Sequence, residues 1–168
     1  VKALEKAQEY ALTEQQREVI RLLIEYYKNG DLAVFDAYSI AWLQEQESPV
    51  DFINGFIEVY GDPLAYKASW ESVVEIVDAA ACERTNKLAE NALWFEKNAP
   101  IEDRFKKTQV SGITARVMQV AMLGGDCHPA TPIGINLPNA EWIRERYGSK
   151  SVTLDNITYA YHRASQGS

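Results

Sequence analysis

Apolar residues recur at helical spacing through the first part of the chain. Over residues 13–28, one helical face would carry Val19, Leu22, Leu23 and Tyr26. Thr13 and Gln16 form a capping-box pattern at the start of this segment, and an Asn-Gly pair follows its end. A second helical pattern begins at Asp31, a residue type that caps helices well, and stops before Pro49. These features predict a helical hairpin.

The chain changes character at residue 50, where β-branched and aromatic residues dominate. Residues 50–61 predict a strand that carries a bulge at Gly55 and runs into a Gly-Asp-Pro turn. A long helix is then predicted from Trp70 to Asn98, and Pro100 would end it. The apolar stripe of that helix would consist of Val73, Val74, Val77, Ala81, Leu88, Ala92 and Phe95.

The last third of the chain predicts strands mixed with short helices. Strands are predicted at residues 113–123, 132–137 and 151–154. A short helix is predicted over residues 142–147 with Asn139 as its cap, and a last helix follows from Asp155. The whole pattern predicts an α+β fold in which helix dominates.

Composition narrows the class of protein. The chain has 168 residues, of which 46% are apolar and 11% aromatic, so intrinsic disorder is excluded. No stretch approaches the roughly 18 uncharged apolar residues of a membrane span. Lys and Arg number 17 against 24 Asp and Glu, a net charge of −7 without a basic run. This balance argues against nucleic acid or an anionic membrane as the main partner.

The cysteines and the two ends of the chain add two expectations. Cys82 and Cys127 are too few for the disulfide framework of a small secreted domain, which favours a reducing, cytoplasmic location. Val1 and Ser168 both lie at helical patterns, so we expect this chain to be a piece of a longer protein.

Common catalytic and metal-binding patterns find little support in the residues. Zinc needs three or four ligands, whereas His128 and His162 are 34 positions apart, so no zinc site is expected from this chain alone. Cys127 and His128 are sequence neighbours, which rarely form a nucleophile and its base. The glycines match no nucleotide-binding fingerprint.

Two segments suggest local chemistry. Glu58 interrupts a very apolar strand, and a carboxylate in such a place usually faces a cleft or a partner. In the segment from Gly134 to Asn139, strand alternation turns Asn136 away from the core, and Asn139 follows at the start of a helix. On spacing alone, a purely structural role as turn and cap residues is the favoured explanation of the two asparagines.

The same two segments resemble the substrate-binding blocks of the dipeptidyl peptidase III family of zinc metallopeptidases. Residues 52–63, Phe-Ile-Asn-Gly-Phe-Ile-Glu-Val-Tyr-Gly-Asp-Pro, are similar to the family block Gly-Phe-Ile-Glu-x-Tyr-x-Asp-Pro. Residues 134–139, Gly-Ile-Asn-Leu-Pro-Asn, are similar to the block Gly-Ile-Asn-hydrophobic-Pro-Asn. Two uncommon blocks in the family's order make the resemblance specific.

The resemblance implies roles for four residues. Glu58, Asn136 and Asn139 would bind the free amino terminus and the first backbone groups of an oligopeptide substrate. Tyr60, two positions after Glu58 and expected on the same strand face, would stabilise the oxyanion during hydrolysis. Recognition of the free terminus at a fixed distance from the metal would make the enzyme release dipeptides.

The resemblance also implies that essential parts lie outside this chain. The family takes its zinc from a His-Glu-x-x-Gly-His helix and a Glu-Glu-x-x-x-Glu helix, and neither occurs here. Zinc is therefore expected in the full-length parent, and the isolated chain is expected to be inactive. The remainder of the parent chain would be its main protein partner, and its loss is expected to promote non-native self-association.

A two-lobed family architecture implies three segments. Residues 1–62 would form the helical hairpin and the strand that lines the substrate, and residues 63–108 a long helix belonging partly to the opposite lobe. Residues 109–168 would form a strand-rich segment with the second block.

Two alternatives remain open at this point. One is a non-catalytic helical module that binds peptides or another protein, and a downstream His-Glu-x-x-Gly-His sequence would argue against it. The other is a small enzyme with Glu58 and Asp62 as paired carboxylates. Four strand positions separate these two residues by about 13 Å, which is more than such pairs usually tolerate.

Overall fold

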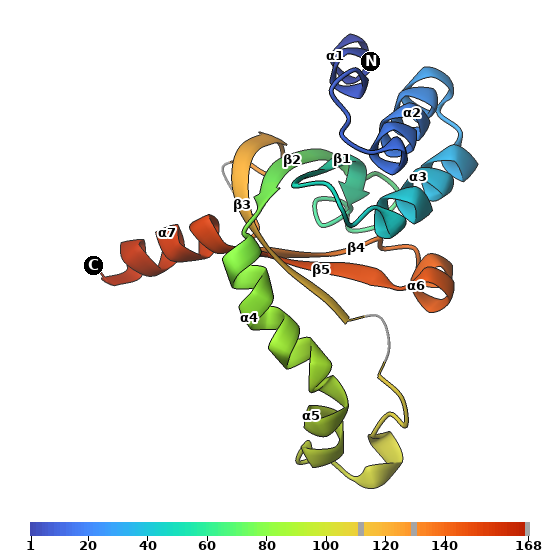
Figure 1. Ribbon diagram of the computed structural model, residues 1–168. Helices are drawn as coiled ribbons and strands as arrows, with labels where there is room; N and C mark the ends of the chain where they lie inside the picture. Colours follow the sequence, from blue (N-terminus) through green and yellow to red (C-terminus); the bar gives the residue numbers. More distant parts are fainter. Residues whose placement is uncertain (111–112, 129–130, 167–168) are drawn as a thin grey trace. The chain divides into compact units, whose positions relative to one another are not determined.

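The structure, a computed structural model, describes residues 1–110, 113–128 and 131–166. Within these ranges it contains seven α-helices, one short 3₁₀ helix and five strands, which confirms the predicted α+β class (Figure 1). Internal contacts divide the chain into two compact units. The helical unit comprises residues 1–49 and 138–149, and the sheet unit comprises residues 50–137 and 150–168. None of the described helices combines the length and the apolar character that crossing a membrane requires.

The helical unit consists of four helices. These are α1 (Lys2–Gln8), α2 (Glu14–Asn29), α3 (Leu32–Gln44) and α6 (Glu141–Tyr147). Helix α2 packs on α3, α1 packs on α2, and α6 contacts α3. The core is made of buried apolar side chains from three of these helices, chiefly Val19, Ile20, Leu23, Tyr38, Trp42, Leu43 and Ile143.

Local capping explains why the predicted hairpin is confirmed. The Thr13 hydroxyl accepts a hydrogen bond of 2.9 Å from the backbone N–H of Gln16 and so caps α2. Gly30 ends α2 in the left-handed conformation at a φ of 70°, which glycine adopts without strain. The Asp31 carboxylate accepts a hydrogen bond of 2.8 Å from the backbone N–H of Ala33 and caps α3. Each of these signals acts within four residues.

The sheet unit is built on five strands. They are β1 (Val50–Glu58), β2 (Ser69–Val77), β3 (Ile113–Gly125), β4 (Gly134–Leu137) and β5 (Ser149–Leu154). Their order in the sheet is β1-β2-β3-β5-β4, so β1 and β4 form its two edges. The pairs β1–β2, β2–β3 and β4–β5 are antiparallel.

Three helices and a short turn also belong to the sheet unit. They are α4 (Ala79–Glu90), α5 (Ala92–Asn98) and α7 (Asp155–Gln166), and a 3₁₀ turn covers Asp103–Phe105. Helices α4 and α7 both contact β3 (Figure 1). Asp78 caps α4 by accepting a hydrogen bond of 2.9 Å from the backbone N–H of Ala81, and this bond is the main reason that the pKa of Asp78 lies below its ordinary value.

The predicted long helix from Trp70 to Asn98 is wrong. Residues 69–77 form strand β2, and the helical part that follows is divided at Asn91 into α4 and α5. The β2 segment contains four β-branched residues, and its backbone pairs with β1 on one side and β3 on the other. This non-local pairing overrides an apolar spacing that also fits a helix. The expected segment boundaries at residues 62 and 108 both fall within the sheet unit.

The predicted bulge is also displaced along β1. The pairing with β2 stays regular through Gly55 and shifts between Phe56 and Glu58 instead. Because β1 advances two residues there while β2 advances one, the extra residue is Ile57.

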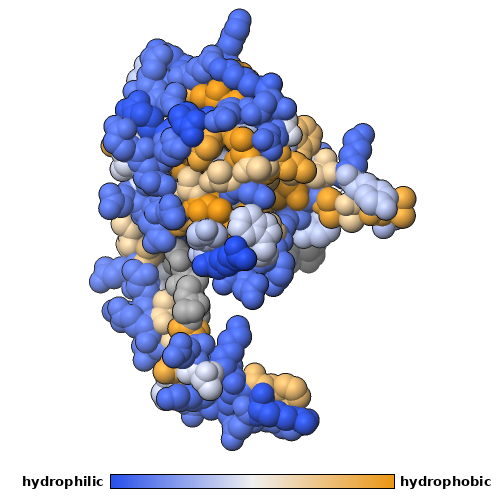
Figure 2. All heavy atoms as spheres, turned by 90° about the vertical axis from the view of Figure 1, so that its right-hand side faces the viewer, coloured by the Kyte–Doolittle hydropathy of each residue, from blue (hydrophilic) through white to orange (hydrophobic). Residues whose placement is uncertain are grey.

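Apolar side chains reach the surface as well as the cores. Figure 2 shows them as patches among hydrophilic residues on one face. Around α4, α5 and the 3₁₀ turn, Leu88, Trp94 and Phe105 are exposed by 60%, 60% and 63%. A cavity of about 420 Å³ in the same region is lined mainly by apolar side chains, including Leu88, Ala92, Phe95 and Val110.

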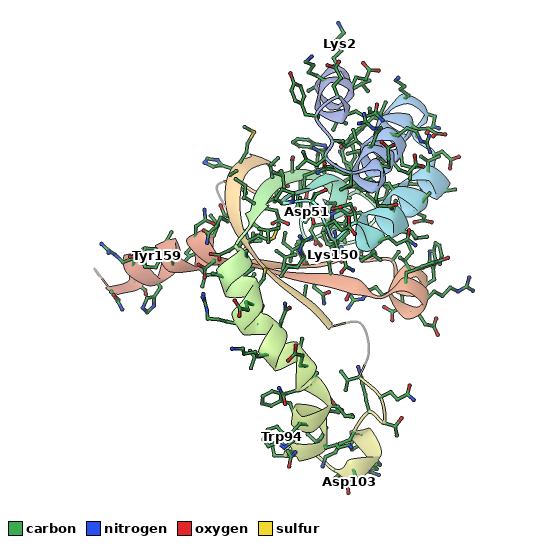
Figure 3. All side chains as sticks on the ribbon, viewed as in Figure 1. Lys2, Asp51, Trp94, Asp103, Lys150 and Tyr159 are labelled. Carbon is green, nitrogen blue, oxygen red and sulfur yellow. The ribbon has the colours of Figure 1, made fainter. Side chains whose placement is uncertain are left out.

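The sheet curls strongly, as one long-range ion pair shows. The Asp51 carboxylate on β1 lies 3.0 Å from the Lys150 ammonium on β5, although β2 and β3 separate these strands in the sheet (Figure 3). In a flat sheet, three strand spacings of about 4.8 Å would hold the two backbones roughly 14 Å apart, with both side chains perpendicular to the sheet. The contact therefore requires that the inner faces of β1 and β5 turn toward each other. Met118, Val152 and Leu154 form an apolar cluster inside the same unit.

Candidate substrate-binding site

Glu58 lies at the end of edge strand β1, opposite Ser69 of β2. The Ser69 hydroxyl donates a hydrogen bond of 3.2 Å to the backbone carbonyl of Glu58 and holds the two strand ends together. The bulge at Ile57 directly precedes Glu58, so the simple strand alternation that predicted its face does not apply. The Glu58 side chain is half-buried.

Two further acidic residues lie near Glu58. Glu71 is on β2, and Asp126 directly follows the last residue of β3. Burial is the main cause that raises the pKa of Glu71 above its ordinary value, and the charges of Glu58 and Asp126 raise it further. The charges of Glu58 and Asp126 thus both act on the Glu71 carboxyl group at one end of the sheet. A cation bound there would relieve their repulsion.

The backbone at this end of the sheet is tightly packed. Gly125 has a φ of +60°, and a Cβ atom at this position would lie 2.0 Å from the carbonyl oxygen of Trp70. The backbone N–H of the next residue, Asp126, donates a hydrogen bond of 3.0 Å to that same oxygen. Only glycine fits the close approach, and the approach fixes Asp126 beside the start of β2.

Tyr60 lies beyond β1, in the turn that follows the strand. The expectation that Tyr60 shares a strand face with Glu58 is therefore wrong, because β1 ends at Glu58 itself. The Tyr60 side chain is 89% exposed. Its hydroxyl is thus open to a partner at the edge that carries Glu58.

Asp62 organises the loop after Tyr60. Its carboxylate accepts three backbone N–H hydrogen bonds, from Leu64 at 3.0 Å, Tyr66 at 2.9 Å and Lys67 at 2.9 Å. These bonds lower the pKa of Asp62, with the bond from Leu64 as the largest cause. Ala65 inside the loop adopts the left-handed conformation at a φ of 55°, which costs a non-glycine residue energy. Because its oxygens serve the loop backbone, Asp62 is poorly placed to act as an acid/base partner of Glu58.

Asn136 lies on the opposite edge strand, β4. It pairs with Ser151 of β5, and its side chain is exposed, as strand alternation predicted. The next residue, Leu137, is buried, as is Lys150 opposite it. Because successive strand residues point to opposite faces, the buried Leu137 holds the neighbouring Asn136 at the surface of the β4–β5 hairpin.

Asn139 precedes the N-cap residue of α6. That helix begins at Glu141, and Ala140 in the capping position makes no side-chain capping hydrogen bond. Asn139 is exposed and belongs to the helical unit. The N-cap position expected for Asn139 is thus taken by Ala140.

The four predicted residues fall on separate parts of the structure. Glu58 and Tyr60 lie at the β1 edge, Asn136 lies at the β4 edge, and Asn139 lies in the other unit. Sequence reasoning missed Glu71 and Asp126 as neighbours of Glu58. The density of β-branched residues after position 72 was the available signal, since it marks β2 as a strand.

A family model provides the deciding comparison. The model described as Peptidase family M49 matches residues 1–167, nearly the whole chain. The chain belongs to peptidase family M49. This finding confirms the predicted resemblance to the dipeptidyl peptidase III proteins.

Individual curated proteins are similar to this chain over much of its length. Dipeptidyl peptidase 3 of Homo sapiens is 30% identical over 157 residues, which are 94% of this chain and 21% of the human protein. A protein named Nudix hydrolase 3 from Arabidopsis thaliana is 34% identical over 122 residues, which are 72% of this chain and 16% of that protein. The chain thus spans about one fifth of the length of the curated relatives it matches.

A solved M49 structure shows the same fold. The structure of DPP III from Caldithrix abyssi matches with a TM-score of 0.86 and 30% sequence identity. The match covers 95% of this chain and 30% of that protein chain. The described arrangement of helices and strands is therefore that of an M49 segment.

Within this M49 segment, the geometry supports neither Cys127 as a nucleophile nor a metal site. Cys127 is buried, and burial followed by the charge of Glu71 raises the pKa of its thiol to about 11. Such a thiol stays protonated at neutral pH and is a poor nucleophile. No group of three or more His, Cys, Asp and Glu side chains suited to a metal ion occurs in the part of the chain that the structure describes.

Proposed function

We propose that this chain forms part of an M49 dipeptidyl peptidase and binds the amino terminus of its oligopeptide substrate. The observation that supports this most is the half-buried Glu58 at an acidic end of the sheet, together with Glu71 and Asp126. An ammonium group has three N–H donors and one positive charge. The half-buried Glu58 and Glu71, with the exposed Asp126, provide both the acceptors and the opposite charge.

The remaining predicted residues would bind the substrate backbone and stabilise the oxyanion. Asn136 and Asn139 each offer an amide NH₂ for a peptide carbonyl and an amide oxygen for a peptide N–H. Tyr60 would donate its hydroxyl proton in a hydrogen bond to the oxyanion of the tetrahedral intermediate. Because Tyr60 is so exposed in this chain, we propose that other parts of the peptidase enclose it when substrate binds.

The metal would belong to another part of the parent protein. The described residues do not fit a zinc site, because they offer no converging set of three ligands. Bound elsewhere in the peptidase, zinc would polarise the scissile carbonyl and activate a water molecule. We therefore propose that the chain alone does not hydrolyse peptides.

The apolar surface around α4 and α5 supports the proposal that another part of the parent protein packs against it. Leu88, Trp94 and Phe105 are largely exposed beside an apolar cavity. We propose that the remainder of the parent chain contacts this surface, and that the isolated chain self-associates through it.

The thiols of Cys82 and Cys127 form no disulfide, which supports a reducing, cytoplasmic location.

The test compares the complete protein with this chain. The complete protein should release a dipeptide from an unblocked dipeptidyl-arylamide, and the chain with added zinc should not. In the complete protein, Glu58→Gln should raise KM for the unblocked substrate strongly, whereas the exposed Glu83→Gln on α4 should leave it unchanged. Hydrolysis by the chain alone, or unchanged kinetics of Glu58→Gln, would contradict the proposal. Peptide binding without hydrolysis by the complete protein would favour a non-catalytic peptide-binding module.

A further inference from the structure

Four charged residues from four different strands meet inside the curled sheet. They are Asp51 on β1, Glu75 on β2, Arg116 on β3 and Lys150 on β5, exposed by only 3%, 0%, 9% and 1%. Figure 3 shows Asp51 and Lys150 close together in the interior of this unit. Charged side chains are almost never buried unless they are paired, so the pairing within this cluster matters.

Asp51 is the paired carboxylate of the cluster. Its Oδ2 atom accepts a hydrogen bond of 3.0 Å from the Lys150 ammonium and lies 3.4 Å from Nη1 of Arg116. One oxygen of Asp51 thus contacts both cations. These contacts tie β1 to β3 and β5 across the interior of the sheet.

Glu75 is the second carboxyl group, and its situation is different. In the antiparallel pairing of β1 and β2 it lies directly opposite Asp51, so both side chains point to the same inner face. Both Glu75 carboxyl oxygens are buried and have no hydrogen-bond partner among the residues that the structure describes. Ionised Glu75 would thus carry a buried negative charge without a hydrogen-bond donor at its oxygens unless a cation moved to it.

The charges that face Glu75 come from every strand packed against it. Asp51 on β1 opposes its ionisation, and Lys150 on β5 and Arg116 on β3 favour it. Desolvation is the largest effect, and the net result raises the pKa of Glu75 to about 7. With Glu75 protonated the cluster carries one excess positive charge, and with Glu75 ionised it is neutral.

We infer that Glu75 is a proton-controlled competitor of Asp51 for the Lys150 ammonium, so that the proton on Glu75 regulates how firmly β1 is held to β5. A lysine side chain is flexible and can turn between two neighbouring carboxylates, whereas an arginine presents a rigid donor fork. When Glu75 loses its proton, the Lys150 ammonium divides its hydrogen bonds between the two carboxylates. The Asp51–Lys150 contact that holds the sheet curled is thereby weakened.

The direction of the pH effect follows from proton linkage. The native pKa of Glu75 lies above its ordinary value of 4.5, so the folded sheet binds this proton more tightly than the unfolded chain. The stabilisation is fully present below about pH 4.5 and is lost as the pH rises through about 7. The sheet is therefore held less firmly at pH 8 than at pH 6.

Hydrogen exchange in the complete protein tests this inference locally. After correction for intrinsic exchange rates, peptides from β1 and β5 should lose protection between pH 6 and pH 8. Glu75→Gln keeps the shape of the protonated side chain but cannot ionise, so this variant should retain protection at pH 8. The exposed Glu83→Gln on α4 is the matched control and should behave like the unchanged protein. A Glu75→Gln variant with the same loss of protection as the unchanged protein would overturn the inference.

A second measurement tests the inference on the unchanged protein, so it does not depend on whether a substituted variant folds. Infrared spectra of the protein with isotope-labelled glutamate should contain the carbonyl band of a protonated carboxylic acid at pH 6, and this band should weaken by pH 8. A spectrum without a protonated glutamate at pH 6 would overturn the inference independently of any substitution. Both measurements are independent of peptidase activity, so their outcome is separate from that of the proposed function.

Discussion

Asp51 and Glu75 lie directly opposite each other on β1 and β2, and both are buried, yet among the described residues only Asp51 has a cation within hydrogen-bond distance. The two positions are almost equivalent in the sheet. What separates them is the curl of the sheet, which brings Lys150 from β5 onto Asp51. This asymmetry makes one carboxylate a structural link and leaves the other to titrate near neutral pH.

Removal of the buried ammonium should destabilise the sheet unit strongly. Lys150→Met removes one of the two cations that contact the buried Asp51 carboxylate, and breaking one partner of a buried pair typically costs about 3–5 kcal/mol of unfolding free energy. The exposed pair of Lys28 and Glu5, 2.9 Å apart, offers a matched control: Lys28→Met should cost at most about 1 kcal/mol. Urea unfolding of the variants measures both effects. Equal losses for the two variants would show that Asp51 does not depend on Lys150.

The stability of the chain should depend on pH through Glu75. Because the native pKa of about 7 exceeds the ordinary value of 4.5, the unfolding free energy should fall by about 3 kcal/mol between pH 4.5 and pH 7.5 from this group. Glu75→Gln should remove this component and be the more stable protein at pH 8. Thermal unfolding across this range is the measurement, and an unchanged slope in Glu75→Gln would contradict the prediction.

Sequence reasoning succeeded where the determining interactions are local. The hairpin of α2 and α3 was predictable because Thr13, Gly30 and Asp31 act on residues at most four positions away. The strand at residue 50 was predictable because its β-branched and aromatic residues leave no helical alternative. Two short blocks were enough to identify the family, since their order is specific.

Sequence reasoning failed where long-range pairing decides. Residues 69–77 have an apolar spacing that fits a helix, and only the pairing with β1 and β3 makes them a strand. The same error concealed Glu71 as a neighbour of Glu58 and Glu75 as a neighbour of Asp51. The contact of Asp51 with Lys150 joins residues 99 positions apart and depends on the curl of the sheet. No local pattern in the sequence encodes it.

A side chain at Gly125 should disrupt the acidic end of the sheet. Gly125→Ala would place a Cβ atom 2.0 Å from the Trp70 carbonyl oxygen at a φ of +60°, and such backbone strain typically costs about 1–3 kcal/mol. Gly61→Ala is the control, because no atom lies within 4 Å of a Cβ there and the position needs no positive φ. Urea unfolding should separate the two variants. Similar stabilities would indicate that the backbone around Trp70 yields easily.

The loop after Tyr60 should lose its order when Asp62 is replaced. Asp62→Ala removes all three carboxylate hydrogen bonds that hold the backbone N–H groups of Leu64, Tyr66 and Lys67. Nothing else in the short loop replaces an acceptor of this kind, and the left-handed Ala65 then relaxes toward conformations without strain. Trypsin should therefore cut after the exposed Lys67 faster in this variant than in the unchanged chain.

Cleavage at this one bond distinguishes loss of the loop from a mere change of charge. Asp103→Ala removes the same charge from an exposed site, where the carboxylate lies 2.8 Å from the Lys106 ammonium and supports no loop backbone. This control should leave the rate of cutting after Lys67 unchanged. If both variants are cut there at the rate of the unchanged chain, the three hydrogen bonds of Asp62 do not order the loop. If only Asp62→Ala is cut faster, the carboxylate fixes the loop beside Tyr60, and the same variant should then raise KM for an unblocked peptide in the complete peptidase.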